Sequence, residues 1–126
     1  MLTECPIRMS IPARDIQRAK AFYAEQLGMH PAHETPFGLI YACENTFFTI
    51  IQHESAGKMG YSLMTWLTKN LDSEVALLRA RGVIFEEYDL PDIGLKTVNG
   101  IAELGGDRIA WFKDSEGNLL AVAQVI

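Results

Sequence analysis

The sequence contains the same series of elements twice, and this duplication limits its fold more than any other feature. The segment from Thr46 to Gln52, TFFTIIQ, has the same apolar profile as the segment from Asn118 to Gln124, NLLAVAQ. Each segment ends a series of one strand pattern, one amphipathic helix pattern and further strand patterns. A single unit of this kind cannot bury its own apolar face, whereas two copies side by side can. We therefore predict an α+β fold with two copies of a strand, helix and three-strand module.

The two helix patterns begin and end at matching residues. Asp15 and Asn70 stand where an N-cap is expected, because their side chains can accept hydrogen bonds from the first helical turn. Gly28 and Gly82 stand where the helices should stop. We predict a single domain over residues 1–126, with module one at 1–53, a polar linker at 54–60 and module two at 61–126. The predicted strands are 5–11, 29–35, 38–44 and 46–53 in module one, then 61–69, 83–90 and a hairpin over 108–125 in module two.

The composition excludes several classes of function. The chain has 126 residues, of which 48% are hydrophobic, so it can bury a core as one domain. Its formal net charge is −5 and no stripe of Lys and Arg interrupts it, which argues against nucleic acid as a partner. No apolar run approaches a membrane span and no leader pattern is seen, so we expect a cytoplasmic protein without membrane contact. Cys5 and Cys43 are too few for a disulfide framework, and we expect both to be buried thiols.

Strand alternation predicts which side chains face away from the helices. If Ile7, Met9 and Ile11 pack on the first helix, then Arg8 and Ser10 point to the opposite side. The matching strand of module two gives the same answer. There, Leu63 and Thr65 point away, with Met64 and Trp66 behind, and the same parity applies to Phe47, Thr49 and Ala121.

Three segments resemble one known family. IPARDIQRAKAFYAEQLGM, TKNLDSEVALLRARGVIF and AWFKDSEGNLLAVAQ together resemble the vicinal oxygen chelate superfamily, which includes glyoxalase I, extradiol dioxygenases, fosfomycin-modifying enzymes and bleomycin resistance proteins. The resemblance spans nearly the whole chain, and the D-x-E-G-N turn is its most specific feature. It implies paired βαβββ modules that form an open, cup-shaped barrel with the helices on the convex side. It also implies a ligand inside the cup and, in many members, a homodimer.

The resemblance also implies where a metal would bind. In the metal-dependent relatives, the ligands come from the first and last strands of each module. The matching residues here are Arg8, Leu63, Thr49 and Ala121, and none of them suits a divalent ion, which needs His, Glu or similar donors. A shift of one residue gives Met9, Met64, Phe48 or Ile50, and Leu120 or Val122, which supplies no donor either. We therefore expect no metal and no other cofactor.

The histidines do not restore a metal site. His30 and His33 are three residues apart in a segment that is predicted to be extended, so they should point to opposite faces. His53 and Glu54 begin the linker, where solvent exposure is the simplest expectation.

These arguments give one set of candidate ligand-binding residues. Trp111 occupies a place where the relatives often carry an aromatic contact, and Tyr41 is its approximate partner in module one. Two alternatives stay open: the aromatic residues fill the core, and Arg8 pairs with a carboxylate such as Glu103 or Asp107. The full set is Arg8, Ser10, Tyr41, Phe47, Thr49, Leu63, Thr65, Trp111 and Ala121.

The lining is apolar and aromatic with a few hydroxyls and one arginine, which favours a metal-independent small-molecule binding protein. Such a protein would sequester or carry an aromatic or cationic compound, as bleomycin resistance proteins do. The alternative is a lyase, isomerase or transferase of the glyoxalase class, with metal held by other residues or with acid–base groups such as Tyr41, Glu86 or Tyr88. No catalytic residue can be assigned from the sequence. A third possibility is a dimerisation or regulatory module with a filled cup.

Overall fold

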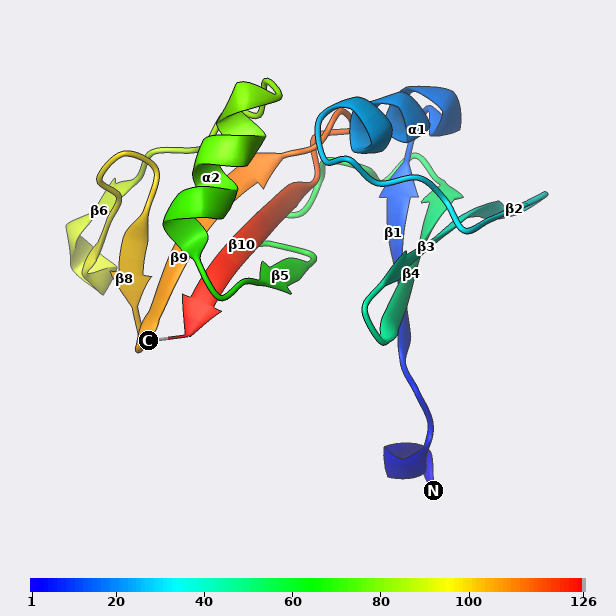
Figure 1. Cartoon of the computed structure of the whole chain (residues 1–126), viewed down its shortest axis with the longest axis horizontal. Helices are drawn as coiled ribbons and strands as arrows, with labels where there is room; N and C mark the ends of the chain where they lie inside the picture. Colours follow the sequence, from blue (N-terminus) through cyan, green and yellow to red (C-terminus); the bar gives the residue numbers. More distant parts are fainter. Residues whose placement is uncertain (126) are drawn as a thin grey trace.

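The predicted duplication is present as two modules that lie side by side (Figure 1). The computed structural model describes residues 1–125. Neither helix in this range is long and apolar enough to cross a bilayer. Module one contains a short 3-10 helix, Leu2–Glu4, followed by β1 Arg8–Ala13, α1 Ile16–Glu25, β2 His33–Thr35, β3 Gly38–Cys43 and β4 Thr46–Gln52. Module two contains β5 Thr65–Leu67, α2 Leu71–Ala80, β6 Asp89–Leu90, a 3-10 helix Pro91–Ile93, β7 Leu95–Lys96, β8 Ala102–Leu104, β9 Asp107–Lys113 and β10 Leu119–Val125.

Each module forms a four-stranded sheet with the same topology. The strand order is β1-β4-β3-β2 in sheet one and β5-β10-β9-β8 in sheet two. The first strand of each sheet runs parallel to the last, and the remaining pairs are antiparallel. The two sheets stay open and form no closed barrel. The fold is therefore α+β with two βαβββ modules, as the sequence predicts.

The matching residues of the two copies have matching structural roles. Asp15 accepts a hydrogen bond from the amide of Arg18 at 3.0 Å, and Asn70 accepts one from the amide of Ser73 at 3.1 Å. Both are therefore N-caps. The last glutamine of each copy also ties its strand to the start of its own helix. Gln52 donates to the carbonyl of Arg14, and Gln124 accepts from the amide of Leu71 at 2.8 Å.

Module two departs from the predicted strands in two places. The strand expected over 61–69 is regular only in β5, and the strand expected over 83–90 is reduced to one bridge between Phe85 and Phe112, with β6 after it. The chain leaves the sheet edge after Phe85 and forms a small β6–β7 ribbon. The edge position beside β9 is then taken by β8, which lies within the segment read from sequence as a glycine-rich connection.

Both modules contribute to a single hydrophobic core. The rings of Tyr41 and Phe48 stack at 4.9 Å between centroids, Phe48 meets Trp66 of module two at 6.2 Å, and Trp66 meets Phe112 at 6.3 Å. We call the face of each sheet that packs on its helix the inner face, and the opposite face the outer face. Because both inner faces share this core, both outer faces point away from it. The core residues include Ile11, Tyr23, Tyr41, Phe48, Ile50, Leu71, Val75, Phe85, Phe112, Leu120 and Val122.

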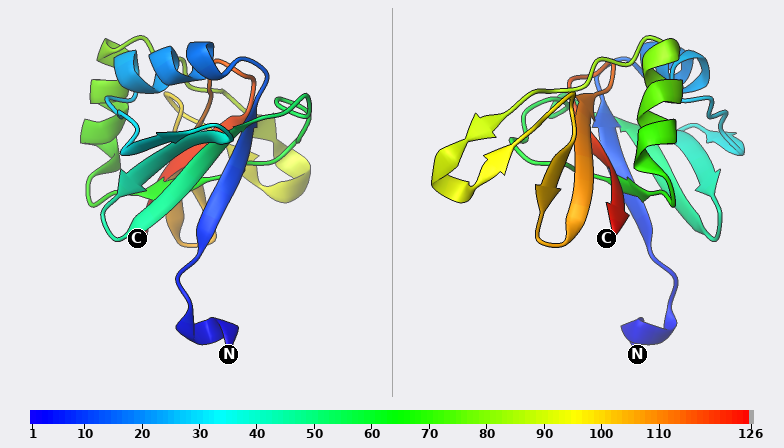
Figure 2. Two further views of the ribbon diagram at one scale, coloured as in Figure 1. Left: turned by 90° about the vertical axis from the view of Figure 1, so that its right-hand side faces the viewer. Right: turned by 60° about the vertical axis from the view of Figure 1, so that its left-hand side comes forward.

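The N-terminal segment projects from the body of the molecule (Figure 2). Ile7 is 81% exposed and Met9 is 44% exposed, so the expectation that they pack on the first helix is wrong for the single chain. The reason is that β1 extends past the end of α1, and only Ile11 and Ala13 are covered. Cys5 is also exposed and Cys43 is half-buried, so the expectation that both thiols are buried is wrong.

The turn between β9 and β10 holds the two modules together. Its residues Asp114, Glu116 and Asn118 are buried, which is unusual for polar side chains unless they are paired. The hydroxyl of Tyr23 donates to Asp114 at 2.9 Å. The side-chain amide of Asn118 donates to the carbonyl of Pro12 at 2.8 Å. All three polar side chains thus point from module two into module one.

Glu116 carries the strongest of these contacts. Its carboxylate accepts from the guanidinium of Arg18 at 2.8 and 3.0 Å and from the amide of Asp15 at 2.9 Å. Burial by itself would raise the pKa of Glu116, but hydrogen bonds from Arg18, the Asp15 amide and Ser115 together lower it to about 2. Glu116 therefore stays charged and binds the first turn of α1.

The linker is packed against the same turn. Gly57 donates its amide to the side-chain oxygen of Asn118 at 3.2 Å. A Cβ atom on Gly57 would lie 2.8 Å from the carbonyl oxygen of Glu116, and one on Gly117 would lie 3.3 Å from the Cα of Gly57. Both residues have positive φ angles, so glycine suits both positions in geometry and in space.

We predict that Glu116→Gln lowers the free energy of unfolding at neutral pH by about 2 to 3 kcal/mol, because a buried charged acceptor is lost. The pKa of Glu116 falls from an ordinary 4.5 to about 2 on folding, so this stabilisation is present above pH 4.5 and is lost as the pH falls towards 2. Urea denaturation of both proteins at neutral pH and at about pH 2.5 measures the effect. Glu54→Gln, in the exposed linker, is the control. A difference between wild type and Glu116→Gln that is the same at both pH values would contradict the prediction.

Candidate functional site

The outer face of sheet one carries four of the predicted residues. The parallel pairing of β1 with β4 sets Arg8 beside Phe47 and Ser10 beside Thr49. Phe47 is 47% exposed, Thr49 is half-buried, and Arg8 and Ser10 are exposed. This face is therefore an open surface with one aromatic ring, two hydroxyls and one guanidinium.

The outer face of sheet two carries a second group. Thr65, Ala121 and Trp111 lie in one row across β5, β10 and β9. Ala121 is buried, Thr65 is exposed, and Trp111 is half-buried with its ring edge-on to Tyr88 at 5.6 Å. The aromatic neighbour of Trp111 is therefore Tyr88, whereas the sequence analysis named Tyr41 as its counterpart.

Leu63 lies just before β5, where its amide donates to the carbonyl of Leu119 at 2.9 Å. It is half-buried and packs against the core cluster. The structure therefore gives Leu63 a packing role.

The two outer faces are not brought together within one chain. The inner faces of the sheets meet in the core, so the outer face with Ser10 and Thr49 and the outer face with Thr65 and Trp111 both point away from it. Four pockets among residues 1–125 contain no residue of the predicted set in their lining.

Tyr41 lies on the inner face of sheet one, so the expectation that it lines the ligand site together with Trp111 is wrong. Its neighbours across the sheet show that it shares the inner face with Phe48, whereas Ile40 and Ala42 of the same strand lie on the outer face. Tyr41 is fully buried between Tyr23 and Phe48. Its hydroxyl has no hydrogen-bond partner among residues 1–125. Burial and the nearby charge of Glu34 raise the pKa of Tyr41 to about 12.

Arg8 is exposed and forms no ion pair with any described residue. The two carboxylates considered as partners lie in sheet two. Glu103 lies in β8 and Asp107 begins β9, and the guanidinium near them is Arg108, which pairs with Asp72 at 3.0 Å. The charge of Arg8 is therefore available on the outer face of sheet one.

The residues at the four expected metal positions do not fit a divalent ion. Arg8 is a cation, Thr49 offers only a neutral hydroxyl, and Leu63 and Ala121 have no donor atom. Over residues 1–125, no group of three or more His, Cys, Asp or Glu side chains is arranged as a metal site. The donor chemistry of this chain thus differs from that of the metal-dependent relatives.

The acid–base groups named for an enzymatic alternative are poorly placed for it. Tyr41 is enclosed in the core. Glu86 lies 3.5 Å from the ammonium of Lys113. Burial and the charge of Glu86 raise the pKa of Tyr88. Its hydroxyl therefore loses its proton less readily than that of a free tyrosine.

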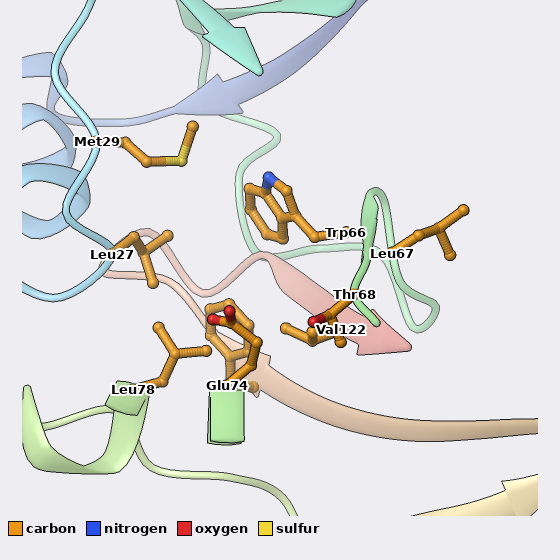
Figure 3. Close-up of a pocket in the computed structure, with 9 residues that line it drawn as sticks. Leu27, Met29, Trp66, Leu67, Thr68, Glu74, Leu78 and Val122 are labelled. Carbon is orange, nitrogen blue, oxygen red and sulfur yellow. The ribbon is translucent and has the colours of Figure 1, made fainter. Parts of the chain in front are cut away.

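A pocket exists elsewhere, between α2, the inner face of sheet two and the segment that follows α1 (Figure 3). It has a volume of about 250 Å³. Sequence reasoning missed it, because strand alternation placed Trp66 only behind the outward-facing residues, on the side of the helix. No periodic signal marks such a pocket, since it forms where the end of α1 meets module two. Its lining residues are Leu27, Met29, Trp66, Leu67, Thr68, Glu74, Leu78, Phe112 and Val122.

A family profile matches most of the chain. The profile of the Glyoxalase/Bleomycin resistance protein/Dioxygenase superfamily matches residues 7–122. The chain therefore belongs to this superfamily. A comparison with curated protein sequences gave no significant match.

Solved structures with the same fold include an antibiotic binding protein and a lyase. TnmS3, an antibiotic binding protein from Streptomyces sp. CB03234, is 23% identical, with a TM-score of 0.71 over 96% of this chain and 95% of that one. A glyoxalase/bleomycin resistance protein/dioxygenase from Alicyclobacillus acidocaldarius is 17% identical, with a TM-score of 0.73 over 96% and 91% of the two chains. Lactoylglutathione lyase from Agrobacterium tumefaciens is 14% identical, with a TM-score of 0.66 over 95% and 93%. At these identities the likeness establishes the fold alone.

We predict different effects for the two buried tyrosines of the core. Tyr23→Phe should lower the free energy of unfolding by about 1 to 3 kcal/mol, because buried Asp114 loses a hydrogen-bond donor. Tyr41→Phe should leave it unchanged or raise it, because that hydroxyl is buried without a partner. Urea denaturation at neutral pH measures both, and equal losses in the two variants would show that Tyr41 has a partner.

Proposed function

We propose that this protein is a metal-independent small-molecule binding protein that sequesters or carries a flat aromatic compound. The observation that carries the proposal is the composition of the two outer faces. They present Phe47 and Trp111, the hydroxyls of Ser10 and Thr49, and Arg8, which pairs with no carboxylate among residues 1–125. Arg8 and Thr49 stand at two of the positions where the metal-dependent relatives carry donors. Aromatic walls with a few polar groups are typical of small-molecule sites.

The class of ligand follows from the charge on these faces. Arg8 is the only ionised group among the predicted residues, and a guanidinium binds carboxylates, phosphates or carbonyls in a defined orientation. Phe47 and Trp111 favour a flat ring by stacking. An aromatic compound with a carboxylate or carbonyl group fits both features better than a cation. The fold shared with TnmS3, an antibiotic binding protein, supports a small-molecule ligand.

We propose that a second copy of the chain completes the site, so that the outer face of sheet one in one copy meets the outer face of sheet two in its partner. Each face alone is too open to enclose a ligand. The edge strands β1 and β5 each have one unpaired edge, which is a ready surface for association. Large apolar side chains are exposed at these edges: Ile7, just before β1, at 81%, Met9 in β1 at 44% and Leu67 in β5 at 73%. A homodimer that also covers the free edges of β1 and β5 would bury them.

The proposed compartment is the cytoplasm. Both cysteines are free thiols, and Cys5 is exposed, which suits a reducing environment.

The second candidate is a lyase, isomerase or transferase of the glyoxalase class. The fold shared with a lactoylglutathione lyase favours it. It requires a metal held outside the four family positions, or an acid–base group close to the ligand. Stoichiometric divalent metal in protein purified without added metal, together with turnover of a thiohemiacetal substrate, would establish it.

We predict that a shared site shows complementation in mixed dimers. Arg8→Ala alters the outer face of sheet one and Thr65→Trp blocks the outer face of sheet two; both residues are exposed, so both variants should fold. Each variant alone should lose binding of 2-naphthoate, a flat aromatic carboxylate. A mixed dimer should regain half of the wild-type number of sites, because one site then has both changes and the other has none. Calorimetry of dimers purified with two different tags measures this.

A mixed dimer that binds no 2-naphthoate would show that each site lies within one chain. A wild-type protein that is monomeric at micromolar concentration in sedimentation experiments would also contradict the shared site.

Chelation provides a separate prediction. Dialysis against EDTA should leave the affinity for 2-naphthoate within about twofold of its starting value, because no described donor set needs a divalent ion. A large loss of affinity that added Zn²⁺ or Mn²⁺ restores would favour the enzymatic candidate.

A further inference from the structure

The pocket between α2, the inner face of sheet two and the segment after α1 has the lining expected of a small-molecule site, and it is separate from the outer faces. Figure 3 shows Leu27 and Leu78 on one side, Trp66 and Thr68 on the other, and the carboxylate of Glu74 between them. Its volume of about 250 Å³ is larger than that of an apolar cavity known to hold benzene, about 150 Å³. Leu67 is 73% exposed and lies at its rim, so the pocket is accessible from solvent.

Glu74 is the only charged side chain that lines this pocket. It is half-buried and makes no ion pair or side-chain hydrogen bond with any residue in the described range. Its neighbour Asp72 on the same helix, by contrast, is paired with Arg108. The position of Glu74 in the first turn of α2 stabilises its negative charge through the helix dipole. A half-buried carboxylate whose oxygens have no protein partner in the described range is a free acceptor for a cation that enters the pocket.

The walls of the pocket suit an organic cation better than a metal ion. Trp66 presents an indole ring, the aromatic group that attracts cations most strongly. Met29 adds a polarisable thioether, and Leu27, Leu78 and Phe112 supply apolar surface. One carboxylate is too few donors for a divalent ion. No lysine or arginine lines the pocket to compete for Glu74.

We propose that this pocket binds a small aromatic or aliphatic amine, with its ammonium group on the carboxylate of Glu74 and its apolar part between Trp66, Leu27 and Leu78. The site is independent of the outer faces, which carry Arg8 and favour anionic or carbonyl groups. The two sites therefore select ligands of opposite charge.

The test uses 2-phenylethylamine, which is protonated at neutral pH, and its neutral analogue 2-phenylethanol. Wild-type protein should bind the amine more tightly than the alcohol. Glu74→Gln should weaken binding of the amine about 10- to 100-fold, because a charge-assisted contact is lost, and should leave binding of the alcohol nearly unchanged. Calorimetry measures all four affinities. Glu54→Gln, which removes the same charge from the exposed linker, is the control and should leave the affinity for both ligands unchanged.

Fluorescence identifies the place of binding. Trp66 and Trp111 are the two tryptophans of the chain, so Trp111→Phe leaves Trp66 as the only one. The amine should change the emission of Trp66 in this variant, and 2-naphthoate should not compete with the amine. These readouts also separate the two proposals, since loss of the outer-face site leaves amine binding intact.

Three results would overturn the inference. They are no binding of the amine by wild-type protein at millimolar concentration, equal affinity for the amine and the alcohol, or equal affinity of wild type and Glu74→Gln for the amine. A loss of helix stability in Glu74→Gln would not imitate the expected result, because it would weaken both ligands together.

Discussion

Two buried carboxylates in the turn between β9 and β10, Asp114 and Glu116, form hydrogen bonds with module one. The relative position of the two sheets depends on these contacts. The environments of the two carboxylates shift their pKa values in opposite directions. Burial raises the pKa of Asp114 more than its hydrogen bonds from Asn118 and Tyr23 lower it, whereas the contacts of Glu116 with Arg18 and the Asp15 amide outweigh its burial. Removing a partner from such a group leaves an unpaired polar atom in the core, which costs far more than a surface contact. The turn therefore sets how α1, β1 and the linker lie against module two.

This placement decides which faces of the two sheets are buried and which are exposed. It turns both inner faces into one shared core around Phe48, Trp66 and Phe112, and it leaves a pocket where the end of α1 falls short of α2. It also turns the outer faces away from the core. The two outer faces of one chain therefore do not face each other, and this is why the site that we propose includes a second copy.

Much of the fold could be predicted from sequence because the duplication repeats local signals. The caps Asp15 and Asn70 have partners three residues further along the chain, so their roles follow from spacing. Tyr41 was misplaced because GLIYAC is continuously apolar, and alternation cannot decide between two apolar faces. Ile7 and Met9 were misplaced because their cover depends on elements beyond their own strand. The pocket around Glu74 was invisible, since it depends on contacts between modules rather than on any periodic pattern.

A crystal structure of the protein with 2-naphthoate bound tests the central claim most directly. The account predicts a dimer in which the ligand lies between Arg8, Phe47 and Thr49 of one copy and the Thr65 and Trp111 face of the other, with its carboxylate on Arg8 and no metal ion among its contacts. A ligand that touches both outer faces of the same chain, or an ion held there by protein atoms, would contradict it.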